Sequence, residues 1–217
     1  MHSGSQPSQP SEPSQPSLTE RRKTETRLDI ARTAAALFVA DGLRATRAED
    51  IARAAGVAPR TFYRYFATKE ESVAPLFTAG AQQWAEAVRR APAELSVPDA
   101  LRYAVTDALG AGGTGAVESL DWVRALLRMS AESPALRSVW ADACHASEQT
   151  LLAVLGERAG GPAGPDLDLR LAAAVASAAV RVAVEAWAAG DASADASDGP
   201  AALAARCLAA LDAFPWP

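Results

Sequence analysis

Hydrophobic residues recur at helical spacing along most of the chain, and no stretch alternates as a half-buried β-strand would. The first apolar stripe consists of Ile30, Ala34, Leu37 and Phe38. It predicts a helix that begins after Ser17 and runs to Ala40, where Asp41 and Gly42 end it. Alanine is very frequent and also favours helices. The sequence therefore predicts an all-α protein.

Further apolar stripes are separated by segments rich in Gly, Pro or polar residues. They predict helices at 69–90, 97–109, 116–131, 134–159, 167–189 and 200–214. Ser96 and Ser133 are typical of helix starts, because each shortly precedes a proline. Pro75 falls inside the 69–90 helix, and we expect it to kink that helix. With two short helices described next, about nine helices are expected.

The stretch from residue 46 to residue 66 predicts two short helices joined by a tight turn. Thr46 and Glu49 have the spacing of a capping box, which indicates the start of the first helix. Gly56 can adopt the positive φ that a helix end needs, and Pro59 suits the first turn of the second helix. Val57 is expected to be buried in the turn. This spacing predicts a helix-turn-helix, whose second helix would read DNA.

The second short helix, from Arg60 to Phe66, has two different faces. Phe62 and Phe66 are four residues apart and are expected to face inward. The outward face would consist of Arg60, Thr61, Tyr63, Arg64 and Tyr65. Thr68 and Glu71 have the spacing of a second capping box, which places Lys69 in the first turn of the next helix.

Charge is distributed unevenly along the 217 residues, whose net charge is −5. Residues 18–70 contain 11 Lys and Arg against 7 Asp and Glu, whereas residues 71–217 contain 10 against 18. A basic head on an acidic body is typical of a nucleic-acid reader with a separate second domain. Chance asymmetry on a solvated surface is an equally compatible explanation.

Composition predicts three parts. Residues 1–17 consist mainly of Ser, Gln and Pro, and we expect a disordered arm without an assigned function. Residues 18–68 would form the DNA-binding domain, and residues 69–217 a ligand-binding and dimerisation domain. Neither a signal peptide nor a membrane helix is expected, so the sequence predicts a cytoplasmic protein. Cys144 and Cys207 are too few for a disulfide framework and are expected to be free thiols.

The two C-terminal helices contain many small residues. The 167–189 helix is apolar on nearly all sides, so most of its surface should be buried. The last helix has one stripe, made of Leu203, Cys207, Leu211 and Phe214. Both helices are candidates for a subunit interface. Burial within one subunit is the alternative.

Two motifs that suggest other chemistry fail on their context. Residues 110–115 match the dinucleotide fingerprint G-x-G-x-x-G, but no strand precedes them and an all-helical chain has no parallel sheet to hold the cofactor. Cys144 and His145 are adjacent, but the only other histidine is His2, in the arm. A metal site needs more ligands, and a catalytic site needs more groups. No cofactor, metal or catalytic residue is therefore expected, and the sequence indicates that the protein is not an enzyme.

A specific family resemblance covers residues 20–75. Ile51 to Phe66 read I-A-R-A-A-G-V-A-P-R-T-F-Y-R-Y-F and are followed by Thr68-Lys69-Glu70. This run resembles the signature of the TetR family of transcriptional regulators, and the first apolar stripe, Gly42 and Thr46 extend the match. The resemblance implies phosphate contacts for Thr46, Tyr63, Tyr65 and Lys69. It implies contacts to base edges for Pro59, Arg60, Thr61 and Arg64. Ala58 departs from the pattern, since a serine usually caps this helix.

The remainder resembles TetR-family bodies in architecture, and Trp122 to Trp187 are similar to regulators of an acyl-CoA-like ligand class. We therefore expect a homodimeric regulator, most simply a repressor, that binds a palindromic operator in double-stranded DNA. A small apolar or acyl-type effector would release it from the operator. The effector pocket would be lined by some of Trp84, Tyr103, Trp122, Leu126, Met129, Trp140 and Cys144. The helix at 69–90 would transmit binding to the DNA reader. A DNA-binding protein without an effector, and an enzyme with a DNA-binding appendage, are the alternatives.

Overall fold

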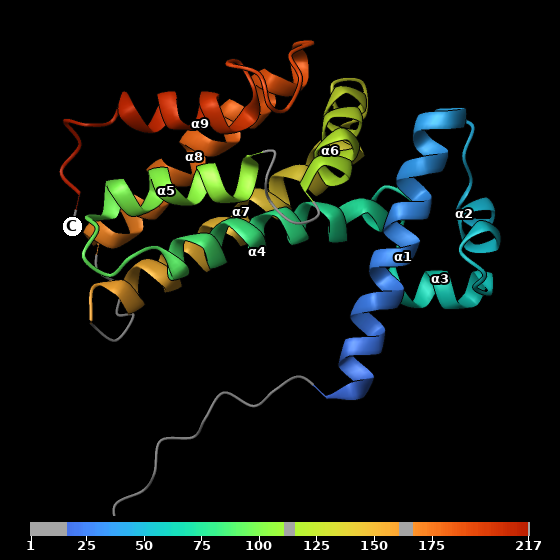
Figure 1. Cartoon of the computed structure of the whole chain (residues 1–217). Helices are drawn as coiled ribbons and strands as arrows, with labels where there is room; N and C mark the ends of the chain where they lie inside the picture. Colours follow the sequence, from blue (N-terminus) through green and yellow to red (C-terminus); the bar gives the residue numbers. More distant parts are fainter. Residues whose placement is uncertain (1–16, 111–115, 161–166, 217) are drawn as a thin grey trace, which may run out of the picture.

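The computed structural model describes residues 17–110, 116–160 and 167–216. These residues form nine α-helices and one 3-10 turn, and they contain no strand. In chain order the elements are α1 (Leu18–Asp41), α2 (Ala48–Ala54), α3 (Pro59–Tyr65), η1 (Glu71–Val73), α4 (Ala74–Arg90), α5 (Val97–Leu109), α6 (Ala116–Ser130), α7 (Pro134–Arg158), α8 (Leu167–Ala189) and α9 (Pro200–Ala209). Helices α1 to α3 lie at one end of a longer bundle formed by α4 to α9 (Figure 1). The all-α prediction is confirmed for the part that the structure describes.

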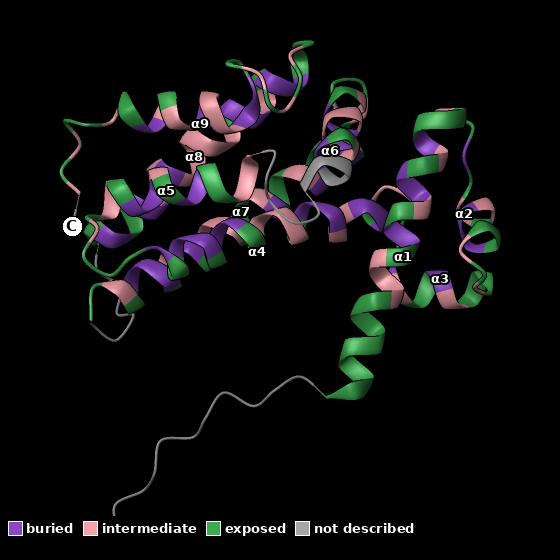
Figure 2. Cartoon of the chain, in the orientation of Figure 1, coloured by how far each residue is buried: buried purple, intermediate pink, exposed green. Residues whose placement is uncertain are grey.

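Helix α1 begins and ends as its sequence predicts. The Ser17 hydroxyl accepts the Glu20 N–H at 3.2 Å and caps the first turn. At the other end Gly42 has a φ of 86° and donates its N–H to the Phe38 carbonyl at 3.0 Å. The C-terminal half of the helix is buried on one side, from Ile30 to Phe38, whereas its first two turns are exposed (Figure 2).

Helix α2 begins one residue later than predicted, and the Thr46–Glu49 capping box is wrong. The N-cap is Arg47, whose N–H donates to the Asp50 carboxylate at 3.3 Å. Thr46 is only 3% exposed, and its hydroxyl donates to the Gly42 carbonyl at 3.0 Å. Thr46 is buried in the loop and cannot cap the helix. Asp50, rather than the predicted Glu49, therefore accepts the N-cap N–H.

Helix α4 begins at Ala74 rather than at Lys69, because the 3-10 turn η1 precedes it. Half of the second capping box is confirmed, since the Glu71 N–H donates to the Thr68 hydroxyl at 3.1 Å. The Glu71 carboxylate accepts from Ala67 N–H at 2.9 Å. Pro75 lies in the first turn of α4. A proline in a first turn removes no intrahelical hydrogen bond, so the predicted kink at Pro75 is wrong.

The remaining helices follow the predicted ranges, with earlier ends for three of them. Helices α6, α7 and α9 end at Ser130, Arg158 and Ala209. After α9 the chain makes short turns, in which the Phe214 ring contacts the Trp216 ring at 4.7 Å between centroids. The Ser96 and Ser133 caps are confirmed, with hydroxyls that accept N–H groups at 3.4 and 3.2 Å. Residues 1–16 of the arm predicted at 1–17 lie outside the described residues, as do residues 111–115 and 161–166.

Two hydrophobic cores fill the molecule. The first core joins α1 to α3 with the near ends of α4, α6, α7 and α8, and it includes Phe38, Phe62, Phe77, Leu126 and Leu136. The second core lies among α4, α5, α7, α8 and α9, and it includes Trp84, Leu101, Leu151, Leu155 and Leu208. The N-terminal helices therefore share one continuous core with the bundle.

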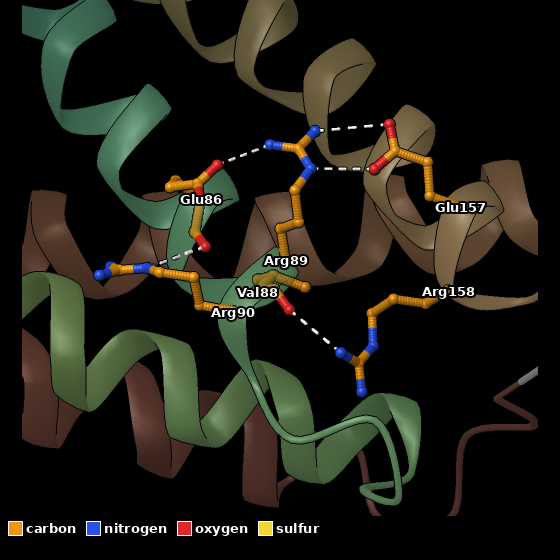
Figure 3. Close-up of polar contacts among 6 residues, drawn as sticks. All are labelled: Glu86, Val88, Arg89, Arg90, Glu157 and Arg158. Atoms are coloured by element: carbon orange, nitrogen blue, oxygen red, sulfur yellow. Dashed lines mark hydrogen bonds and ion pairs between the residues drawn. The ribbon is translucent and has the colours of Figure 1, made fainter. Parts of the chain in front are cut away.

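The far end of α4 is fixed by Arg158, the last residue of α7. Its guanidinium donates to four carbonyls, those of Val88, Ala91, Pro92 and Leu95, at 2.8 to 3.3 Å. The last carbonyls of a helix have no intrahelical partner, and a cation near them also interacts favourably with the helix dipole. Arg158 thus caps α4 and holds the α4–α5 connection (Figure 3).

Arg89 makes a second connection between the same two ends. Its guanidinium lies 2.9 Å from Glu157 of α7 and 2.7 Å from Glu86 of α4 (Figure 3). The hydrogen bond to Glu157, followed by that to Glu86, raises the pKa of Arg89. These side chains are about half exposed, so their contribution to stability is small. Arg158 is the stronger tie.

Candidate nucleic-acid interface and ligand cavity

The orientation of α3 follows from its two phenylalanines. Phe62 is fully buried and Phe66 is 3% exposed, and both belong to the first core. Gly56 has a φ of 67°, and the following Val57 donates its N–H to Ala52 at 2.9 Å, which closes the turn between α2 and α3. Val57 is half-buried rather than buried as predicted. The inward prediction for both phenylalanines is confirmed.

The opposite face of α3 presents basic and aromatic side chains to solvent. Pro59, Arg60, Tyr63 and Arg64 are exposed, whereas Thr61 and Tyr65 are half-buried. Among the described residues the Arg60 side chain has no hydrogen bond or ion pair. The Arg64 guanidinium lies over the Tyr65 ring, 5.2 Å from its centroid. This face can offer a forked donor and aromatic hydroxyls to a DNA groove.

Tyr63 is already engaged with the helix in front of it. Its hydroxyl donates to Glu49 Oε1 at 3.1 Å, and this hydrogen bond raises the pKa of Tyr63. The bond holds the ring across the gap between α2 and α3. Tyr63 is still 51% exposed, so its edge remains accessible.

Thr46 and Lys69 lie deeper than phosphate contacts usually do. The Lys69 ammonium donates to the carbonyls of Leu43 and Thr46 at 2.6 and 2.9 Å. Thr46 is buried and uses its hydroxyl within the loop. An ammonium has three donors, so Lys69 keeps one for a ligand. The Thr46 hydroxyl would have to give up its bonds to Gly42 and Leu37 before it could reach a phosphate.

A cavity of about 110 Å³ lies where α4, α5, α6, α7 and α8 meet. Its walls are mainly apolar and include Leu76, Phe77, Leu120, Val123, Trp140 and Val184. These residues are also part of the first core or pack directly against it. The rings of Phe77 and Trp140 contact edge to face at 5.1 Å between centroids. The cavity therefore adjoins the core that supports α1 to α3.

Three of the seven predicted pocket residues line this cavity, namely Trp84, Trp140 and Cys144. The structure places the other four outside it. Tyr103 is 47% exposed, and Leu126 is fully buried within the first core. Trp122 and Met129 are half-buried against the same core. Aromatic size alone could not show which side of a helix meets the cavity.

Sequence reasoning missed Ser177 and Arg181, which line the cavity from α8. Both are polar residues in a helix that is otherwise rich in Ala and Val. A buried polar residue in an apolar helix needs a partner, so this contrast was the signal that could have identified them. Arg181 pairs with Glu185 at 3.0 Å.

Cys144 is a free thiol on the cavity wall, and Cys207 is also free, as predicted. Burial, followed by the charge of Glu185, raises the pKa of Cys144 to about 12. A thiol with that pKa is not a nucleophile near neutral pH. The described residues contain no cluster of three or more side chains that could hold a metal ion. Residues 111–115, which belong to the rejected fingerprint match, lie outside the residues that the structure describes.

Two arginines of α6 hold the end of α8. The Arg124 guanidinium stacks on the Trp187 ring at 3.9 Å and donates to the Ala192 carbonyl. Arg128 donates to the Ala188 carbonyl at 2.7 Å and pairs with Asp191 at 2.9 Å. Helix α6, which supplies Leu120 and Val123 to the cavity, is thereby joined to α8.

Two protein-family models match this chain. The model of bacterial regulatory proteins of the tetR family matches residues 30–73, and that of the MftR C-terminal domain matches residues 95–212. The HTH-type transcriptional regulator TcmR of Streptomyces glaucescens is 32% identical over 183 residues, which cover 83% of this chain and 81% of TcmR. The chain belongs to the TetR family of transcriptional regulators. Its α2–α3 unit is the DNA-binding helix-turn-helix of that family.

Solved structures agree on the fold of this TetR-family chain. Thermus thermophilus FadR, a TetR-family repressor solved with lauroyl-CoA, is 24% identical, with a TM-score of 0.55 over 85% of this chain and 92% of FadR. Salmonella enterica GusR is 17% identical, with a TM-score of 0.56 over 88% of this chain and 95% of GusR. Among the described residues no helix is both long and apolar enough to cross a membrane.

Proposed function

We propose that this TetR-family chain is a ligand-responsive repressor that binds a palindromic operator as a homodimer. A small apolar or acyl-type effector in the cavity would release the DNA. The observation that carries this proposal is the position of the cavity. Several of its wall residues, among them Phe77, belong to the same core as Phe38 and Phe62. A molecule that spreads Phe77 and Trp140 would therefore disturb the support of α3 directly.

The exposed face of α3 supports the assignment of DNA contacts. Arg60 and Arg64 would reach base edges together with Pro59 and Thr61. Tyr63, Tyr65 and the remaining donor of Lys69 would hold phosphates. Thr46 would contribute to DNA binding by holding the α1–α2 loop in place rather than by donating its hydroxyl to a phosphate. The exposed start of α1 carries Arg21, Arg22 and Lys23, which add positive charge to the DNA-binding domain.

The dimer would form through α8 and α9. In the single chain α8 is not buried on all sides, because Leu171 is 46% exposed and Val182 is 49% exposed. Exposed large apolar residues on a helix of small side chains are typical of a subunit interface. Such an interface would hold two α3 helices about 34–36 Å apart, the separation of successive major grooves on one side of DNA.

Helix α4 is the proposed transmitter, although not through a kink. Its far end is fixed by Arg158, while its near end continues into η1, which packs against α1. The cavity residues Leu76 and Phe77 lie one turn from that near end. A displacement at the cavity would therefore swing the end that faces α1 and leave the Arg158 end in place.

The alternatives differ from this proposal in what they require. A DNA-binding protein without an effector needs no apolar cavity beside its DNA-binding core, so the cavity favours the proposed function. An enzyme would need a catalytic group, and Cys144 is held as a thiol. TcmR is named as a transcriptional regulator, and FadR was solved with an acyl-CoA, which supports a regulator with an effector.

Selection of DNA by the full chain tests the proposal. Random duplexes retained by the protein should converge on a palindrome whose half-sites are about one helical turn apart. An extract or compound pool that releases the retained duplex then identifies an effector. Selection of single half-sites, or no selection at all, would contradict the homodimeric repressor.

A further inference from the structure

Two polar side-chain atoms on the cavity wall have no partner among the described residues. Trp84 is 4% exposed, and its Nε1, which can only donate, has no acceptor in this part of the chain. Ser177 Oγ is buried in the same wall and also lacks a partner there. More than about nine in ten buried polar atoms have one. Two such atoms on one apolar wall mark where a bound molecule supplies the missing partners.

A groove of about 400 Å³ runs between α7 and α8 beside this cavity. The residues that border both spaces are Trp140, Cys144, Ser177 and Arg181. The cavity, at about 110 Å³, is smaller than an engineered apolar cavity of about 150 Å³ that holds benzene. Ligand sites usually measure about 300–1,000 Å³, a range that the groove reaches and the cavity alone does not. A ligand of ordinary size that enters the cavity must therefore extend into the groove.

Charges at the border of the two spaces are already paired. Glu185 accepts from Trp140 Nε1 at 2.7 Å and pairs with Arg181 at 3.0 Å. Further along the groove Glu148 adds a second carboxylate, and Arg137 a cation whose guanidinium donates to backbone carbonyls. The charges of Glu148 and Glu185 balance those of Arg137 and Arg181. Both guanidiniums are engaged, so an anionic ligand would have to displace their contacts, whereas an uncharged ligand leaves them intact. The border thus favours a neutral ligand.

We propose that the effector is an uncharged amphipathic molecule whose apolar ring system fills the cavity and carries a hydrogen-bond acceptor for Trp84 Nε1. Its remaining part passes Ser177 and Arg181 into the groove. A ring ketone or quinone oxygen meets the first requirement, and the Ser177 hydroxyl serves a second oxygen as donor or acceptor. This inference rests on the proposed function, because it takes the cavity to be the effector site.

The probes 1-tetralone and tetralin test the acceptor, because they share a bicyclic skeleton and differ in one carbonyl. The full-length chain, labelled with 15N, has five tryptophan indoles that report binding separately once Trp→Phe variants assign them. Tetralone should bind about threefold to tenfold more tightly than tetralin, the effect of one hydrogen bond. It should shift the indole signals of Trp84 and Trp140 and leave that of Trp122 unchanged.

Matched variants separate the acceptor from general affinity. Trp84→Phe should abolish the preference for tetralone, whereas Trp122→Phe, which removes an indole outside the cavity, should keep it. Should Trp84→Phe fail to fold, the Trp84 indole signal of the wild-type chain provides the second measurement, because tetralone should shift it further than tetralin does. Ser177→Ala removes the donor for a second oxygen, which tetralone lacks, so it should keep the preference. Equal affinity for both probes, a preference that survives Trp84→Phe, or equal shifts of the Trp84 signal by the two probes overturns the acceptor.

Two further outcomes complete the test. Tighter binding of 1-tetralincarboxylate than of tetralone would overturn the uncharged ligand. Retention of a palindromic duplex by a chain that binds neither probe would overturn this inference alone. Failure to select any duplex would instead contradict the proposed function, so the two failures are distinguishable.

Discussion

Arg60 and Lys69 lie in different environments on the same DNA-binding unit. Arg60 is exposed and has no polar partner among the described residues, so its forked donors are available to a guanine. Lys69 is half-buried and holds the carbonyls of Leu43 and Thr46. Arg60 is therefore the proposed base contact, whereas Lys69 ties the α1–α2 loop to the start of η1.

Replacing Arg60 by Ala should reduce operator affinity by about 1–3 kcal/mol, because a bidentate contact to one base is lost. The preference for one base pair should relax at the same time. Fluorescence anisotropy with the selected operator and with random duplexes measures both. An equal loss of affinity for the two DNAs would contradict a base contact.

Replacing Lys69 by Met should lower the free energy of unfolding by about 1.5–3 kcal/mol, since two carbonyls lose a charged donor. Lys23→Met is the matched control, because Lys23 is exposed on the first turns of α1, and its effect should stay within about 0.5 kcal/mol. Urea unfolding in the absence of DNA measures both variants. A Lys69→Met chain as stable as Lys23→Met would show that the tether is unimportant.

The raised pKa of Cys144 makes stability depend on alkaline pH. Burial raises the thiol pKa from 9.0 to about 12 in the folded chain. The folded state therefore binds the proton more tightly than the unfolded state, so stability falls as pH rises from about 9 toward 12. The melting temperature of the wild-type chain should fall further between about pH 8 and about pH 10.5 than that of Cys144→Ala. Parallel curves would contradict the burial of this thiol.

Helix α4 shows which features of an element a sequence can predict. Its apolar spacing gave its far end at Arg90, but the kink at Pro75 depended on a start at Lys69. Lys69 turns toward two loop carbonyls and the chain forms η1 first, which moves Pro75 to the first turn. The start of α4 depends on contacts between residues about 25 positions apart in the sequence. Local hydrophobic spacing cannot predict such contacts.

Arg158→Met should lower the free energy of unfolding by about 1.5–3 kcal/mol, because four carbonyls at the end of α4 and in the α4–α5 connection lose their charged donor. Arg90→Met is the control. Arg90 pairs with Asp107 on the surface, and removal of such a pair costs less than about 1 kcal/mol. Calorimetric melting of both variants decides, and equal melting temperatures would contradict the role of Arg158 as the fixed end of α4.

At the scale of the whole molecule, periodicity and the TetR resemblance predicted the architecture well. The nine described helices and the inward Phe62 and Phe66 agree with it. The cavity was predicted less completely, because its walls come from five helices whose mutual rotation is a tertiary property. Trp84, Trp140 and Cys144 line the cavity, whereas Tyr103 is 47% exposed at the same kind of helical spacing.

Val182→Glu should dissociate the proposed dimer, because it places an unpaired charge in the interface that α8 would form with the second subunit. Val182 is half exposed, so its replacement should disturb folding less than replacement of an α8 residue such as Ala179, which packs against the second core. Val39→Glu is the matched control, since Val39 on α1 is 50% exposed and Val182 is 49% exposed. Light scattering at one concentration should show half the mass for Val182→Glu alone. An intact dimer would move the interface away from this part of α8.

Reciprocal binding tests the central claim, that a ligand in the cavity releases operator DNA. Both ligands act on one two-state protein, so each must weaken the other by the same factor, typically about 5–150-fold. Calorimetry would titrate the effector found by displacement into the full chain, first alone and then saturated with the selected operator. We predict that operator lowers effector affinity by the factor by which effector lowers operator affinity. Equal effector affinities in the two titrations would contradict the account, however tightly the effector bound.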